Sequence, residues 1–283
     1  MRRSTPSRRT ATSRVAAAVV LAAVLAGCGA GAGDEVTVPT VPRTTTPAPP
    51  TLTMPPTTTP ATPAPTAPGG SSGIPGTDTP AGEFRFQPLW PFADVEAAVA
   101  WQDDGGASQP WHLDAEETAL GFAAALGFGE ITEVTSTRFE GDEAWVGVGY
   151  RAEGRTNEAA VLHLARIGRG AEENSPGAPW QVVGTEDDVL VLDTPRYGSA
   201  ASSPVTVGGT ITGVDESLRV QVHDAGSGGP LGDACCVPAG GQDAPWETTV
   251  SYDGGSGDAL TVVAWTGGHV AEVEKFAITA LRR

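Results

Sequence analysis

The aromatic residues of this chain are confined to one part of it, and this segregation most constrains how it can fold. All seven Trp and all seven Phe lie after residue 83, whereas 13 of the 24 Pro lie within residues 39–80. A Pro/Thr-rich segment without large apolar side chains cannot bury enough surface to offset the entropy lost on ordering. We therefore expect a disordered Pro/Thr-rich linker over residues 28–82 and a folded part that begins near residue 83.

The first 27 residues have the composition of an export signal. Five Arg precede an apolar run over residues 15–27, which is too short at about 1.5 Å per residue to cross the ~30 Å hydrocarbon core. The run ends in Leu25-Ala26-Gly27-Cys28, which resembles the bacterial lipobox. That resemblance implies cleavage between Gly27 and Cys28 and acylation of Cys28, for example with palmitate. An uncleaved membrane anchor and a plain secretory signal are the alternatives.

A lipoprotein signal predicts a protein held on the outer face of the cell membrane. More than one acyl chain suffices for stable anchoring, and a Pro-rich linker is an extended spacer. The Thr density of the linker resembles that of the O-glycosylated stalks of exported actinobacterial proteins. An undecorated spacer is the alternative.

The charge of the chain limits its partners. The net charge is −17, and removal of the five Arg of residues 1–27 leaves 12 basic against 34 acidic residues, a net charge of −22. Such acidity repels phosphate backbones, so nucleic acid is not a predicted partner. It also keeps an exported protein soluble.

Residues 83–193 begin with two helical patterns. Apolar residues at helical spacing predict a helix over residues 93–102. A second helix is better delimited, because Asp114 stands as N-cap with Glu117 three residues on and Gly127 follows as the C-terminal glycine. The pattern then changes to a period of two, which predicts strands over residues 133–139, 144–150, 160–165, 180–183 and 190–192. Helices followed by an antiparallel meander favour an α+β domain over residues 83–193. By fold-level analogy, a cone-shaped sheet around a long helix often encloses a pocket.

The residues of this region that first suggest chemistry have structural interpretations as well. His112 precedes an N-cap, a position typical of a surface residue, and His163 lies in a strand, where a half-buried histidine with one hydrogen bond is typical. Neither has an acid or nucleophile that the sequence places beside it. Trp90, Trp101 and Trp111 could line a ligand surface, but filling the core of a small domain is the simpler role.

Residues 194–283 show six or seven short strand patterns separated by Gly-rich turns. Strands are predicted over residues 205–212, 217–223, 231–237, 246–252, 258–265 and 270–281, the last two joined by the turn Thr266-Gly267-Gly268. This pattern favours a β-sandwich of immunoglobulin-like type.

The opening of this second region carries a family resemblance. Pro195-Arg196-Tyr197-Gly198-Ser199 and the segment from Ser203 to Thr210 resemble the start of the bacterial immunoglobulin-like domain associated with spore germination. Residues 218–224 and the C-terminal strand pair also fit that family. The resemblance covers residues 194–283 and implies an accessory module of exported bacterial proteins, without catalytic residues to carry over. A role in germination does not follow from it.

Cys235 and Cys236 are the cysteines that remain once Cys28 is acylated. Adjacent residues of a strand point to opposite faces, which hinders a bridge between them. Outside the cytoplasm, free thiols, a vicinal disulfide in a turn and an intermolecular disulfide all stay open. Two cysteines alone lack the third and fourth ligands of a metal site, so no metal or other cofactor is predicted.

The sequence predicts a non-enzymatic function. It has no P-loop, H-E-x-x-H or EF-hand spacing. We expect a lipid-anchored, extracytoplasmic envelope protein that acts as a non-catalytic binding or assembly module, with envelope proteins or cell-wall components as partners. The alternative is a small-ligand-binding protein or enzyme with its site in residues 83–193. A deep pocket lined by polar groups and a His would favour that alternative, and a filled interior would favour the binding module. A structural stalk protein embedded in the wall is a third interpretation.

Overall fold

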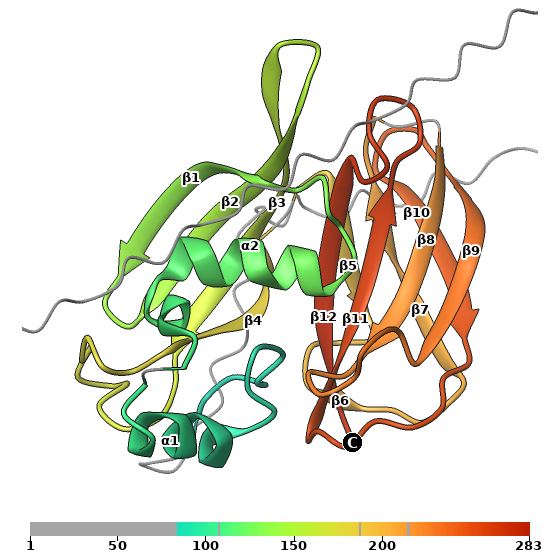
Figure 1. The fold of residues 1–283 in the computed structure, drawn as a ribbon. Helices are drawn as coiled ribbons and strands as arrows, with labels where there is room; N and C mark the ends of the chain where they lie inside the picture. The colour runs from blue at the N-terminus through green and yellow to red at the C-terminus, as the bar shows by residue number, and fades with distance from the viewer. Residues whose placement is uncertain (1–83, 107, 187, 214–215) are drawn as a thin grey trace, which may run out of the picture. The chain divides into compact units, whose positions relative to one another are not determined.

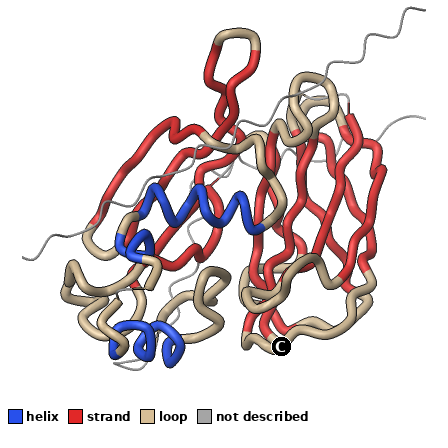
Figure 2. Tube along the Cα trace, viewed as in Figure 1, coloured by secondary structure: helices blue, strands red, loops and turns tan. Residues whose placement is uncertain are grey.

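The fold is built mostly of strands, with few helices. The computed structural model describes residues 84–106, 108–186, 188–213 and 216–283, and Figure 2 shows helix in α1, η1 and α2 alone among them. The helices are α1 (Val95–Asp103), the 3-10 helix η1 (Pro110–Leu113) and α2 (Ala115–Ala125). The strands are β1 (Glu133–Glu140), β2 (Glu143–Ala152), β3 (Arg155–Arg166), β4 (Trp180–Glu186), β5 (Leu190–Thr194), β6 (Ser199–Ala200), β7 (Val205–Ile211), β8 (Glu216–His223), β9 (Gly232–Ala239), β10 (Ala244–Val250), β11 (Ala259–Thr266) and β12 (Lys275–Arg282). The signal, Gly27, Cys28 and the linker lie outside the described residues.

The helix boundaries follow from local sequence and confirm the two predicted helices. Asp94 accepts a hydrogen bond from the backbone N–H of Ala97 at the start of α1. Asp114 caps α2 by accepting from the N–H groups of Glu116 and Glu117, and Gly127 follows α2 with φ +86°. Among the described residues, no helix is long and apolar enough to span a bilayer.

The first four strands form an antiparallel meander in the order β1-β2-β3-β4, as predicted. Helix α2 lies across one face of this sheet (Figure 1) and contributes the fully buried Ala119 and Ala123 to its core. The strands present to that face the alternate apolar residues of β2 and β3, which are Ala144, Val146, Val148, Ala160, Leu162 and Leu164. The period of two in the sequence is therefore the pattern of a sheet with one face in the core.

The predicted strand over residues 190–192 belongs to a different sheet from the meander. β5 pairs antiparallel with β7, so that the second sheet has the order β10-β7-β5. The third sheet has the order β6-β12-β11-β8-β9. These two sheets share one core, to which both contribute fully buried residues: Leu190, Val207, Val250, Leu218, Val220, Leu260 and Val262. The boundary expected near residue 193 thus falls inside β5.

The core between α2 and the meander continues to the outer face of the third sheet. Phe128, which follows α2, contacts Trp265 of β11 and Phe276 of β12 with ring centroids 5.4 and 5.3 Å apart. Thr185 of β4 both donates to and accepts from the backbone of Ile278 in β12. The two regions expected from the sequence are therefore packed together in one compact unit.

The strand predicted over residues 270–281 begins later than predicted, and the predicted tight turn before it is wrong. β12 begins at Lys275, and residues 267–274 form a loop. The carboxylate of Glu274 accepts hydrogen bonds from the backbone N–H groups of His269, Val270 and Ala271. This side-chain acceptor satisfies the donors that a hairpin would have paired across the strands.

Candidate functional site

A row of cation and aromatic side chains crosses the outer face of the meander, opposite to α2. Arg138, Trp145 and His163 stand directly opposite one another in the register of β1, β2 and β3. The Arg138 guanidinium lies 4.1 Å from the Trp145 ring centroid, and the His163 ring stacks on Trp145 at 4.6 Å with an interplanar angle of 5°. Phe86, from the segment before α1, meets His163 edge-on at 5.2 Å. We call these four side chains the ladder.

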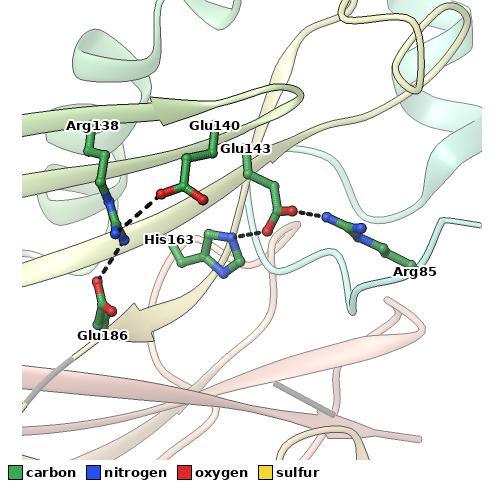
Figure 3. Close-up of polar contacts among 6 residues, drawn as sticks. All are labelled: Arg85, Arg138, Glu140, Glu143, His163 and Glu186. Atoms are coloured by element: carbon green, nitrogen blue, oxygen red, sulfur yellow. Dashed lines mark hydrogen bonds and ion pairs between the residues drawn. The ribbon is translucent and has the colours of Figure 1, made fainter. Parts of the chain in front are cut away.

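Acidic and basic groups flank the ladder (Figure 3). Arg138 forms ion pairs with Glu140 at 3.4 Å and with Glu186 at 3.1 Å. Nε2 of His163 lies 2.7 Å from a carboxylate oxygen of Glu143, whose other oxygen pairs with Arg85.

His163 is a neutral donor in this arrangement. Burial, together with the guanidinium groups of Arg85 and Arg138, lowers the pKa of His163 to about 4. The Glu143 carboxylate alone would favour the imidazolium, but Arg85 balances its charge, and only 6% of His163 is exposed, so burial dominates. At neutral pH the ring therefore donates from Nε2 to Glu143.

The side chains of the ladder are occupied by one another. Within the described chain, the hydrogen-bond partner of His163 is a carboxylate and not a hydroxyl or thiol that it could activate. Trp145 has one face covered by Arg138 and the other by His163, so neither face is left for a sugar or an aromatic ligand. The ladder links β1, β2 and β3 across the strands, and Phe86 continues it into a small apolar cluster with Ala165 of β3 and Val183 of β4.

His112 occupies a buried aromatic cluster, so the expectation of a surface position is wrong. It is 3% exposed and lies 4.9 Å from Phe92, 5.4 Å from Trp101 and 3.8 Å from Trp111, measured between ring centroids. Burial lowers its pKa to about 4. Its Nδ1 is buried without a hydrogen-bond partner among the described residues, while Nε2 lies 3.1 Å from Gln109. The 3-10 helix η1 turns the ring inward, which sequence position relative to the N-cap does not reveal.

The tryptophans expected to fill the core do so in part. Trp101 is 9% exposed, and Trp90 stacks on Trp111 at 5.3 Å with both rings half-buried. Trp90 also packs against Phe122 of α2 at 6.0 Å.

A groove opens at the N-terminal end of α2 and has a volume of about 410 Å³. Its wall is formed by the residues around the N-cap, the β1–β2 turn and the start of β4, namely Leu113, Asp114, Ala115, Glu116, Phe139, Gly141, Arg166, Asn174 and Trp180. Phe139 is 58% exposed and Leu113 is 38% exposed. Two of the three exposed large apolar side chains of the described residues therefore line one groove.

The polar groups of the groove already have partners. Asp114 caps α2, and Glu116 accepts from the Thr137 hydroxyl at 2.7 Å. Arg166 lies 4.3 Å from the Trp180 ring centroid and donates to Asn174 and to the carbonyl of Ala178. The apolar side chains are thus the part of the groove that is available for contact with a partner. The sequence does not predict this groove, because Phe139 has the pattern of an ordinary strand residue.

Cys235 and Cys236 are joined by a disulfide on β9. Across the described ranges of the chain, no group of three or more His, Cys, Asp or Glu side chains has the arrangement of a metal site. Comparison with protein-family models, with curated proteins and with solved structures finds no match to this chain.

Proposed function

We propose that this chain is a lipid-anchored, extracytoplasmic envelope protein whose folded part is a non-catalytic binding or assembly module. The export-type N-terminus, the lipobox resemblance at Cys28 and the Pro/Thr-rich spacer support the location. The groove with exposed Phe139 and Leu113, beside a filled interior, is the observation that carries the binding role.

We further propose that the C-terminal part is an immunoglobulin-like β-sandwich. When the strands are lettered in chain order, β7 and β10 take the places of strands B and E in one sheet, and β8, β11 and β12 those of C, F and G in the other. β5 lies beside β7, as strand A does beside B, and β6 runs parallel to β12 at the edge of the opposite sheet. This strand order supports the family resemblance of residues 194–283.

The filled interior favours a binding module over an enzyme. The core between α2 and the meander contains side chains that are fully buried, among them Ala119, Val146 and Leu162. The groove lies at the end of α2 rather than under it, and no His lines it. It therefore lacks the enclosed polar constellation that catalysis would need.

The partner that fits the groove is a polypeptide segment with apolar side chains flanked by basic ones. Leu113 and Phe139 offer the apolar contact. The two carboxylates of Asp114 and Glu116 outnumber the one cation, Arg166, in the wall of the groove, and the whole chain is strongly acidic. Such a surface attracts a cationic segment and repels an anionic one.

Photo-crosslinking in the intact envelope tests this proposal. A photoreactive phenylalanine analogue in place of Phe139 should capture a polypeptide, and higher salt should reduce the yield. The matched control carries the same analogue at Val270, an exposed apolar residue outside the groove. Capture of the same set of proteins at both positions, or of none at position 139, contradicts the binding role. Stabilisation of the chain by a small molecule without polypeptide capture would favour the small-ligand alternative.

The anchor has a test of its own. Mass spectrometry of the mature chain should show an N-terminal Cys28 that carries acyl groups, and a Cys28→Ser variant should appear in the soluble fraction. An intact leader or an unmodified thiol at Cys28 would remove the basis for the proposed location.

A further inference from the structure

Strand β9 carries a bulge at the two adjacent cysteines. Leu218 of β8 pairs with Val237 of β9, and Val220 pairs with Ala234. Between these two pairs β8 has a single residue, whereas β9 has two, and the register shifts by one. Two residues opposite one is the definition of a β-bulge.

The bulge places both cysteine side chains in solvent. Ala234 and Val237 both pack against the sandwich core, although strict alternation would turn one of them outward. The extra residue removes this conflict, because Cys235 and Cys236 are both exposed and are joined by the disulfide. Cys236 adopts a left-handed backbone with φ +68°. The expectation that adjacent strand residues point to opposite faces therefore fails at this position.

We propose that Cys235 and Cys236 form a reversible thiol–disulfide exchange site whose substrate is a dithiol. Exposed disulfides are the ones that exchange readily, because the attacking thiolate needs access to a sulfur atom. β9 is the edge strand of its sheet, so one side of the bulge is not paired to another strand of that sheet. The site goes beyond the proposed binding role and does not depend on it.

The surrounding sheet lets the pair open without unfolding the domain. Leu218 and Val220, whose β9 partners flank the bulge, have exposed fractions of 0%, so the register on both sides is fixed by the core. Opening the disulfide frees Cys236 to leave the left-handed region, which a side chain with a Cβ rarely adopts. The structural change is therefore confined to the bulge.

The reaction is an ordinary two-step exchange. A thiolate of the dithiol attacks one sulfur, forms a mixed disulfide with it and releases the other as a thiolate, which takes up a proton. The second thiol of the dithiol then displaces the remaining cysteine. The Cys235–Cys236 bond is reduced by two electrons to two thiols, and the dithiol is oxidised to its disulfide.

Alkylation of the folded mature chain tests the exchange site, with dithiothreitol as the dithiol. The peptide that contains both cysteines should carry no alkyl group before reduction and two after it, without denaturant. Reduced chain that is transferred to an oxidant before alkylation should again carry no alkyl group, and the thermal midpoint of the reduced chain should stay close to that of the oxidised chain. Hydrogen exchange should increase on reduction over residues 232–239 and not in β11.

Two variants keep the test decisive if one of them folds poorly. In Cys236→Ser, the free thiol of Cys235 should react with the disulfide of a small monothiol and form a mixed disulfide. In Cys235→Ser, Cys236 should react in the same way. Alkylation that requires denaturant would overturn the proposal, as would two free thiols that persist in the presence of oxidant. An increase of hydrogen exchange throughout β11 on reduction would show a structural cross-link rather than an exchange site.

Discussion

The meander and the five-stranded sheet differ in what covers their second faces. Five of the eight residues of β1 are exposed, whereas all eight residues of β11 are buried. The outer face of the meander carries the ladder, with Arg138, Trp145 and His163 paired side by side and charged groups around them. The outer face of β11 and β12 instead presents Trp265 and Phe276 to Phe128 of the first region.

The difference shows two ways in which the second face of a sheet can be stabilised when its first face lies in a core. A polar face can satisfy itself pairwise across the strands and remain in contact with water. An apolar face must be covered by another part of the chain, because each buried aromatic side chain contributes stability only when it leaves water. The second solution makes the C-terminal sheets dependent on the first region, whereas the outer side of the meander is covered only in part, by Phe84 and Phe86 of the segment before α1.

The largest expected effect comes from breaking this dependence with Phe276→Ala. Phe276 is fully buried and contacts Phe128, so the substitution should reduce the free energy of unfolding by about 3–5 kcal/mol. Chemical denaturation should show one shifted transition, and hydrogen exchange should increase in β2 and β3 as well as in β12. The exposed Phe139→Ala serves as control and should have little effect. Two separate transitions, with β2 and β3 unaffected, would show that the regions fold independently.

The sequence predicted the elements that local rules determine and missed the contacts that depend on distant residues. Asp114 and Gly127 mark the start and the end of α2, and the alternation in β2 identifies its core face. The unbroken apolar run around Val263 is predicted only as a strand, although such a run indicates burial on both faces, which β11 has. The inward orientation of the His112 ring and the loop capped by Glu274 depend on side-chain contacts, which hydrophobic periodicity does not predict.

The groove and the exchange site were also beyond sequence reasoning. Phe139 and Leu113 come together because the β1–β2 turn meets the N-terminal end of α2. The cysteine pair was visible, but its outward orientation depends on one extra residue in the pairing of β9 with β8. A register shift of this kind is set by the partner strand, so alternation within β9 alone cannot reveal it.

A second prediction concerns acid, to which the first region should be sensitive. The pKa values of His112 and His163 are about 4 in the folded chain, below the ordinary value of 6.5, so the unfolded chain takes up protons first as the pH falls. Stability is therefore complete above about pH 6.5 and declines between pH 6.5 and 4. Each histidine should reduce the free energy of unfolding by about 2 kcal/mol between pH 7 and pH 5.

Denaturation curves at a series of pH values measure this slope. His163→Gln should flatten it, whereas His269→Gln, at an exposed position, should leave it unchanged. Burial also lowers the pKa of His223, so some slope should remain in a variant that lacks both His112 and His163. An unchanged slope in His163→Gln would contradict the neutral state assigned to the ladder histidine.

A third prediction isolates the sandwich by altering Asp224. Its carboxylate accepts hydrogen bonds from the backbone N–H groups of Ser256, Gly226 and Gly257 and from the Ser256 hydroxyl, and so ties two loops together. Burial raises the pKa of Asp224, but these hydrogen bonds outweigh it and the net shift is downward. Asp224→Asn should reduce the free energy of unfolding by about 1–2 kcal/mol, because the amide offers one acceptor in place of two.

Hydrogen exchange decides whether this effect stays local. The N–H groups of residues 256 and 257 should lose protection in Asp224→Asn, while the meander keeps its own. Asp253→Asn, in an exposed position of the following loop, is the matched control. Equal destabilisation by both substitutions would show that charge, rather than the hydrogen bonds of Asp224, stabilises the loops.

The smallest effect is expected at the ladder, and it tests whether the polar face stabilises itself. Arg138→Ala removes the cation over Trp145 and two ion pairs, and should reduce the free energy of unfolding by about 0.5–1 kcal/mol because the side chain is half-exposed. Arg138→Lys should recover part of the loss, since it keeps the charge without the planar stack. Arg155→Ala removes a more exposed ion pair and should change stability less.

The pKa of His163 gives the same variant an independent measurement. The Arg138 guanidinium contributes to the lowering of that pKa, so an NMR titration of Arg138→Ala should show it rise toward its ordinary value, with a smaller rise in Arg138→Lys. If the pKa of His163 rises in Arg138→Ala but the free energy of unfolding does not change, the contact of Arg138 with Trp145 does not contribute to stability. Arg138→Ala could instead lose no more stability than Arg155→Ala and leave the pKa of His163 unchanged. That result would show that the ladder does not couple β1 to β3 and that the meander needs no cross-strand pairing on its outer face.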